Sequence, residues 1–131
     1  MSNLKITRIE VHEFNFDMND VSKDYNGFNL VYKKGITQKG TSYATKVFTD
    51  QGLTGEYVGG DSPSFAQFNM FANYLIGKDP TQRELIYNDV KRAMRKFDKM
   101  GMGPIDITLW DLAGKLYNCS ISEMLGGWRT S

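Results

Sequence analysis

The segment Gly101-Met102-Gly103-Pro104-Ile105-Asp106-Ile107-Thr108-Leu109-Trp110-Asp111-Leu112-Ala113-Gly114-Lys115 sets the architecture of this chain. Pro104 suits the first turn of a helix, because its φ is fixed and its missing N–H needs no partner there. Apolar residues then repeat at helical spacing, which predicts one buried face. This stripe comprises Ile105, Leu109, Leu112 and Leu116, widened by Trp110 and Ala113. We therefore expect Trp110 to be a core residue and not a binding aromatic.

The residues after this helix give clear end signals. Asn118 should close the helix in a left-handed conformation. Ser120 and Glu123 have the spacing of a capping box, which predicts a short further helix. Gly126 and Gly127 should end that helix, within the run Met124-Leu125-Gly126-Gly127-Trp128-Arg129.

Two longer helices are predicted upstream. The first begins at Ser62-Pro63, with Ser62 as the expected N-cap, and ends near Gly77. Asp79-Pro80-Thr81 opens the second, with Thr81 and Glu84 at capping-box spacing. The expected buried residues are Phe65, Phe68, Ala72 and Leu75 in the first helix and Ile86, Val90, Ala93 and Phe97 in the second.

Strand signals fill the amino-terminal part of the chain. Alternating residues predict a strand over 4–16, and a slip of phase between Val11 and Phe14 suggests a bulge or a bend. Two more strands, 42–49 and 53–58, form a hairpin around Thr49-Asp50-Gln51-Gly52. The predicted fold is α+β: a three-stranded antiparallel meander followed by a bundle of about four helices.

Residues 17–40 are long for a loop inside a compact domain. Two interpretations stay open. The segment hides a strand at 28–32, or it is a functional or mobile loop.

Composition narrows the class of protein. A chain of 131 residues with 40% hydrophobic and 24% charged residues is typical of one globular domain. A net charge of +1 favours neither nucleic acid nor an anionic membrane as a partner. No apolar run approaches the ~20 residues that span a bilayer. The start of the chain lacks a secretory signal, and Cys119 is the single cysteine, so we expect a soluble cytoplasmic protein.

Several parts of the sequence together resemble the amino-terminal capping domain of the enolase superfamily, in the mandelate racemase/muconate lactonizing enzyme branch. They are the strand at 5–11, the hairpin at 49–56, the turn Ile76-Gly77-Lys78-Asp79-Pro80, and the tryptophan helix with its Leu125-Gly126-Gly127 ending. Ser120 stands where the family usually has proline and Asn118 where it often has glycine. Each of these residues can serve the same role in the backbone as the residue it replaces.

The resemblance implies a (β/α)₈-type barrel that binds Mg²⁺ through three carboxylates and carries lysine or histidine bases. Those bases remove a proton next to a substrate carboxylate. We expect residues 1–131 to be a single capping domain, with the barrel absent from this chain. No catalytic or metal-binding residue is therefore predicted here, and no cofactor in this chain, with Mg²⁺ only in the intact enzyme.

The resemblance also implies that two loops of the capping domain shape the substrate pocket. They correspond to residues 17–40 and 57–61. The predicted substrate-contact residues are Tyr25, Lys33, Tyr57 and Asp61. For each, an ordinary loop residue is an equal alternative.

Other polar residues have simpler interpretations. Asp111 and Lys115 form an i, i+4 pair, and Asp106 should make a polar contact instead of acid–base chemistry. The basic residues Lys91, Arg92, Arg95, Lys96 and Lys99 are expected to form a solvated face. His12 stands alone, which argues against a metal site.

Two functional hypotheses follow. The first is a capping domain of a racemase, cycloisomerase or acid-sugar dehydratase, inactive by itself. The second is a free-standing binding or assembly module with the same fold. A cap removed from its barrel should leave an exposed apolar face, with Trp128 as a candidate member, that binds a barrel domain or another copy. A small carboxylate would be the substrate of the intact enzyme, as a homo-oligomer.

Overall fold

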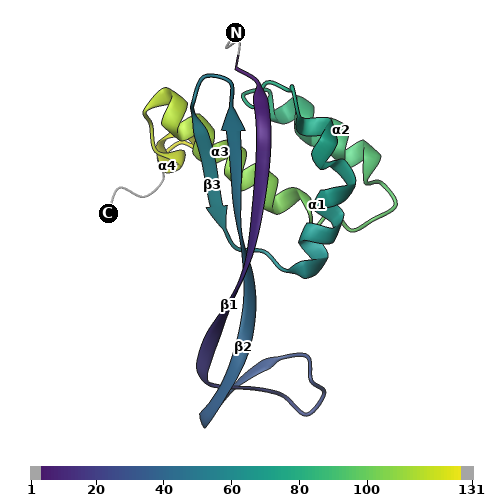
Figure 1. Ribbon diagram of the computed structural model, residues 1–131, viewed down its shortest axis with the longest axis vertical. Helices are drawn as coiled ribbons and strands as arrows, with labels where there is room; N and C mark the ends of the chain where they lie inside the picture. Colours follow the sequence, from purple (N-terminus) through teal and green to yellow (C-terminus); the bar gives the residue numbers. More distant parts are fainter. Residues whose placement is uncertain (1–3, 128–131) are drawn as a thin grey trace.

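The computed structural model describes residues 4–127, and its first layer is an antiparallel sheet of three strands in the order β1-β2-β3 (Figure 1). The strands are β1 (Ile6–Lys23), β2 (Leu30–Thr49) and β3 (Thr54–Val58). Each strand pairs with its neighbour in the chain. The predicted meander is therefore confirmed.

The β1–β2 hairpin is much longer than the sequence suggested. Residues 17–40 are mostly strand, and the chain reverses through residues 24–29. The hidden strand is thus the correct interpretation, and a long loop is wrong. The distal half of this hairpin projects from the body of the domain as a twisted ribbon (Figure 1).

The phase slip between Val11 and Phe14 does not mark a bulge. The ladder with β2 is continuous there, and its irregularities lie between Ile6 and Arg8 and between Asn19 and Val21. Alternation fails near Phe14 because the strand leaves the core at that point, so neither face is strongly buried.

Four helices follow in the described residues: α1 (Ser62–Leu75), α2 (Arg83–Ala93), α3 (Met102–Tyr117) and α4 (Ile121–Met124). Helices α1, α2 and α3 form the second layer, with α3 running behind the sheet (Figure 1). The predicted α+β arrangement is confirmed. Asn118 has φ 49° and closes α3 as expected, and Ser120 and Glu123 form the predicted capping box.

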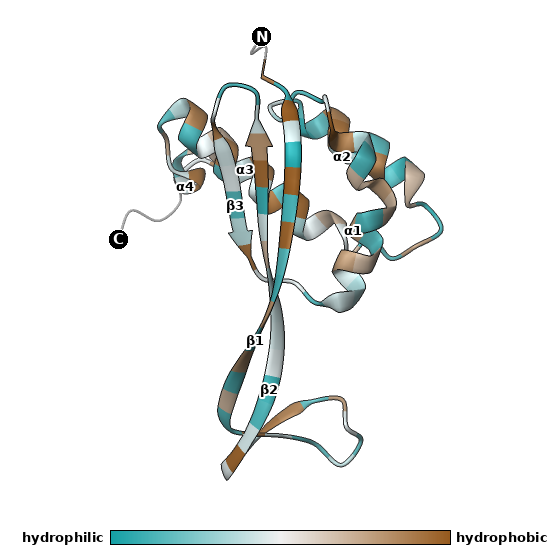
Figure 2. Ribbon diagram, in the orientation of Figure 1, coloured by the Kyte–Doolittle hydropathy of each residue, from teal (hydrophilic) through white to brown (hydrophobic). Residues whose placement is uncertain are grey.

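The core lies between the sheet and the helices, where brown segments of both layers meet in Figure 2. Its fully buried centre joins Val47 of β2 to Leu109 and Leu112 of α3 and Leu75 of α1. Gly55 of β3 lets α3 approach closely, because a Cβ there would collide with the Thr108 carbonyl oxygen and lie 2.8 Å from Leu112 Cβ.

Several helix details differ from the predictions. Asp61 and not Ser62 caps α1, since its carboxylate accepts the Ser64 N–H. The N-cap of α2 is Gln82, so Thr81 and Glu84 form no capping box. Instead Asp79 Oδ1 accepts the Thr81 N–H at 2.9 Å.

The prediction of the buried face of α2 was also wrong at the carboxyl-terminal end of the helix. The helix stops at Ala93, and both Ala93 and Phe97 are exposed. Met94, just past the last turn, fills the core position instead.

Trp110 is not the core residue that its place in the stripe predicted. It is only partly buried, at the border of the buried face of α3. The Arg83 guanidinium carbon lies 4.0 Å from the centre of its ring, in a cation–π contact. Position at the edge of a wide apolar stripe therefore gives a half-covered side chain.

Candidate functional site

The distal part of the hairpin carries two of the predicted substrate-contact residues. Tyr25 lies in the reversing turn with 96% of its surface exposed. Lys33 is also exposed, in β2, where residues 33–36 stand opposite Asp20 in the register. The Gly35 N–H donates to Asp20 Oδ1 at 2.7 Å and holds this irregular segment.

The turn itself is organised by Asp24. Its carboxylate accepts the backbone N–H groups of Asn26 and Phe28, both at 3.1 Å, and the Asn29 side-chain amide at 2.6 Å. The Asn29 hydrogen bond is the largest of the effects that lower the pKa of the Asp24 carboxyl. Tyr25 is thus presented by an ordered turn.

The other two predicted residues lie near the root of the hairpin. Tyr57 is half-buried in β3, opposite Thr45. Asp61 caps α1, and its hydrogen bonds to Ser64 lower the pKa of its carboxyl. The structure therefore places Tyr57 near the end of β3 and Asp61 at the start of α1, and it places Tyr25 and Lys33 in the distal half of the β1–β2 hairpin. This half of the hairpin projects from the domain (Figure 1).

The projecting ribbon is held together by cross-strand side-chain contacts. Hydrogen bonds join Thr41 to Asn15 at 2.8 Å and Thr37 to Asn19 at 3.0 Å, and an ion pair of 3.0 Å joins Lys39 to Asp17. The Phe16 ring covers Gly40, where an added Cβ would lie 2.6 Å from the ring. Such pairs are what stabilise a two-stranded ribbon.

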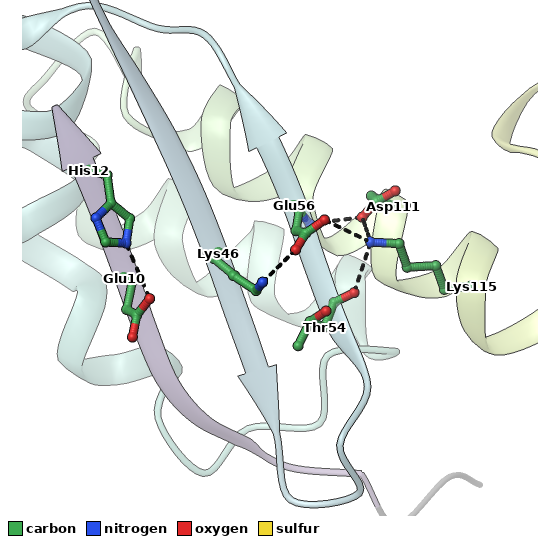
Figure 3. A network of polar contacts seen from close by, with 7 residues as sticks. All are labelled: Glu10, His12, Lys46, Thr54, Glu56, Asp111 and Lys115. Atoms are coloured by element: carbon green, nitrogen blue, oxygen red, sulfur yellow. Dashed lines mark hydrogen bonds and ion pairs between the residues drawn. The ribbon is translucent and has the colours of Figure 1, made fainter. Parts of the chain in front are cut away.

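A second polar cluster lies at the free edge of β3. Asp111 Oδ2 accepts the Glu56 N–H at 2.8 Å, and Lys115 Nζ donates to the Thr54 carbonyl at 3.1 Å. Asp111 and Lys115 also pair with each other at 2.7 Å, and Lys46 pairs with Glu56 at 2.7 Å (Figure 3). The predicted Asp111–Lys115 pair is confirmed, and it satisfies backbone groups of an edge strand as well.

Charge in this edge cluster explains two pKa shifts. The hydrogen bond and charge of Lys46, with the charge of Lys115, lower the pKa of the Glu56 carboxyl. Burial alone would lower the pKa of the Lys115 ammonium, but the carboxylates of Asp111 and Glu56 together raise it. Both shifts favour the ionised forms of Glu56 and Lys115.

His12 is the single histidine of the sequence. Its Nε2 lies 3.2 Å from Glu10 Oε2 on the open face of the sheet (Figure 3). Within residues 4–127, no group of three or more His, Cys, Asp or Glu side chains could hold a metal ion. The residues described thus do not fit a Mg²⁺ site.

Sequence reasoning missed the residues at the junction of hairpin and helices. Tyr43, Glu13 and Ser62 share hydrogen bonds there. A tyrosine in a predicted strand, opposite an acidic residue, was the available signal. It could not be read without the pairing register.

Comparison with known proteins identifies the family to which this chain belongs. The sequence model of the mandelate racemase/muconate lactonizing enzyme amino-terminal domain matches residues 31–126. The chain belongs to this family.

The curated relatives match this chain over only a part of their own length. It is 41% identical over 83 residues to D-galactarolactone cycloisomerase of Agrobacterium fabrum, a match covering 59% of the chain and 22% of that protein. It is 33% identical over 105 residues to D-galactonate dehydratase family member RspA of Cellvibrio japonicus, covering 70% and 25%. The chain thus spans about a quarter of their length.

Solved structures of other proteins share the fold. D-glucarate dehydratase from Agrobacterium tumefaciens, complexed with magnesium, superposes with a TM-score of 0.77 at 23% identity, covering 98% of this chain and 34% of that one. At that identity the likeness shows the fold alone. In the chain described here, no helix within residues 4–127 has the length and apolar character needed to cross a membrane. Trp128, the candidate for an apolar patch, lies outside the described residues.

Proposed function

We propose that residues 1–131 form a single capping domain of a Mg²⁺-dependent enolase-superfamily enzyme. The reaction class is proton removal next to the carboxylate of a hydroxy acid or acid sugar, as a dehydratase, racemase or cycloisomerase. The observation that carries this proposal is the family match over residues 31–126, which includes β2 and the helices behind it. The names of the relatives support an acid-sugar substrate.

In this proposal the chain's own residues shape and close a site whose metal and bases belong to a barrel. The hairpin would carry Tyr25 and Lys33 toward the substrate, where the Lys33 ammonium suits a carboxylate. The segment 57–61 would carry Tyr57, while Asp61 holds the segment by capping α1. When bound in the barrel, Mg²⁺ would stabilise the enolate. The single thiol, Cys119, supports a cytoplasmic location.

The partner proposed for the chain is a barrel domain or another copy of itself, in a homo-oligomer. Large apolar side chains of the hairpin support this, because they stand in solvent: Phe14, Phe16, Tyr25, Phe28, Leu30 and Tyr32. A ribbon of two strands is marginally stable in water, so cover by a partner would stabilise it.

The same exposed hairpin is compatible with a free-standing binding module. Size-exclusion chromatography with light scattering separates the two proposals. Self-association, or capture of a barrel domain from a relative, favours the capping domain. A clean monomer that captures no barrel favours the module.

The decisive experiment joins this chain to the barrel of a relative. Residues 4–127 replace the matching segment of the Agrobacterium fabrum D-galactarolactone cycloisomerase, and turnover of its lactone is measured with Mg²⁺ and with EDTA. We expect metal-dependent turnover by the chimera and none by the 131-residue chain alone. Turnover by the chain alone, or a folded chimera that binds Mg²⁺ but is inert, would contradict the proposal.

A further inference from the structure

The hairpin changes character at the cross-strand pair Glu13–Tyr43. On the core side of this pair, β2 lies between β1 and β3, and β3 runs alongside it as far as the pair Ala44–Val58. The Gly59 N–H then donates to the Tyr43 carbonyl at 2.9 Å, next to the end of β3. Beyond Tyr43, the sheet continues only as the β1–β2 ribbon (Figure 1).

Tyr43 belongs to β2, and its side chain contacts two other elements at this junction, β1 and α1. Its side chain is buried, with 6% of the residue exposed, and its ring stacks on Phe65 of α1 with centres 4.3 Å apart. Its hydroxyl donates to Glu13 Oε2 of β1 at 2.8 Å and lies 2.7 Å from Ser62 Oγ at the start of α1. A phenol has one proton, so the Ser62 hydroxyl donates to the Tyr43 oxygen when Tyr43 donates to Glu13.

The ribbon beyond the junction is braced by its own contacts. The pairs Asn15–Thr41, Asp17–Lys39 and Asn19–Thr37 join its strands, and Phe16 covers Gly40. An arm braced in this way moves as a unit, and its direction depends on how its root is attached.

We infer that Tyr43 is a positioning residue that fixes the direction in which the β1–β2 hairpin leaves the domain. Its hydroxyl ties β1 and the first residue of α1 to β2, one residue beyond the last pair of β2 with β3. The functional meaning of this inference, placement of Tyr25 and Lys33 over a substrate, rests on the proposed function. The mechanical claim concerns the chain itself.

Substitutions at the junction can remove its contacts one at a time. In Tyr43→Phe the ring remains to stack on Phe65, while the hydrogen bonds to Glu13 and Ser62 are lost. In Glu13→Gln a side-chain oxygen can still accept from Tyr43. In Glu13→Leu no acceptor remains. Glu13 is exposed, so both of its variants should fold.

Electron–electron distance spectroscopy on the 131-residue chain tests the inference. Spin labels are placed at Lys23→Cys, near the end of β1, and Asn73→Cys on α1, both exposed, in a Cys119→Ser background. We expect one narrow distance distribution in the parent chain and in Glu13→Gln. Tyr43→Phe and Glu13→Leu should broaden the distribution and shift its maximum. A thermal melt of each variant confirms that the core remains folded.

The inference is overturned if Tyr43→Phe and Glu13→Leu give the parent distribution, or if Glu13→Gln is as broad as Glu13→Leu. If Tyr43→Phe fails to fold, the two Glu13 variants decide between the same outcomes. An inert chimera would remove the proposed function and leave this distance measurement unaffected.

Discussion

Asp106 shows how one side chain in α3 carries a charge into a half-buried position. Burial raises the pKa of its carboxyl, attraction to Arg83 opposes that effect, and repulsion from Glu84 adds to it. The folded state therefore holds the Asp106 proton more tightly than the unfolded state does. An ionised Asp106 lowers the free energy of unfolding at neutral pH, and this loss disappears as the pH falls through the raised pKa and below the ordinary value of 3.8.

We predict that Asp106→Asn stabilises the chain at pH 7 and that the gain vanishes at a pH below 3.8. Urea denaturation at the two pH values measures it. Asp17→Asn, on the exposed ribbon, is the control and should not show this pattern. A gain for Asp106→Asn that is equal at both pH values would contradict the assignment.

Single residues also show why sequence reasoning succeeded or failed locally. Asn118 and the Ser120–Glu123 box were predicted because their signals are confined to a few neighbouring residues. Asp61 and Ser62 are adjacent and both can cap a helix, so the pattern alone could not choose between them. Trp110 was misplaced because Arg83, from another helix, covers its ring.

The close contact of α3 with β3 requires a residue without a side chain at position 55 of β3. Gly55 lies against the Thr108 carbonyl and Leu112 of α3. By contrast, Gly103, inside the first turn of α3, has open space where a Cβ would stand. These two glycines form a matched pair.

We predict that Gly55→Ala lowers the free energy of unfolding by about 1–3 kcal/mol, because the helix must move away from the strand. Gly103→Ala should raise it by up to about 1 kcal/mol through helix propensity. Chemical denaturation of both variants measures the difference. Equal effects of the two substitutions would show that α3 does not rest on β3 at Gly55.

Among the properties of the elements, the lengths of the strands were the hardest to predict from the sequence. Strand β3 and the inner half of β2 were predicted because one of their faces is buried and alternates with polar residues. Residues 17–40 have little burial to impose a period, so the pairing of Asn15, Asp17 and Asn19 with β2 could not be read.

At the scale of the whole molecule, the projecting ribbon is separate from the core. Its side chains are largely exposed, while the largest fully buried side chains all lie outside the ribbon. The ribbon should therefore govern association more than stability.

We predict that replacing residues 17–39 with Asn-Gly, which joins the paired residues Phe16 and Gly40 by a two-residue turn, leaves the core folded. The free energy of unfolding should change by no more than about 1 kcal/mol, since a lone ribbon is only marginally stable. Self-association, measured by light scattering, should fall. A shortened chain that cannot fold would refute the separation of ribbon and core.

The length of this ribbon also bears on the route by which the chain folds. Ile6 and Thr49 are paired in the finished sheet although far apart in sequence, so joining them directly would require closing a long loop. Pairing can instead start at Lys23 and Leu30, on either side of the short turn over residues 24–29, and proceed inward one pair at a time. Each new pair then extends an existing ladder and closes no larger loop. The ribbon that projects farthest from the core thus lets β1 and β2 pair, and then join the core, with the smallest cost in loop-closure entropy.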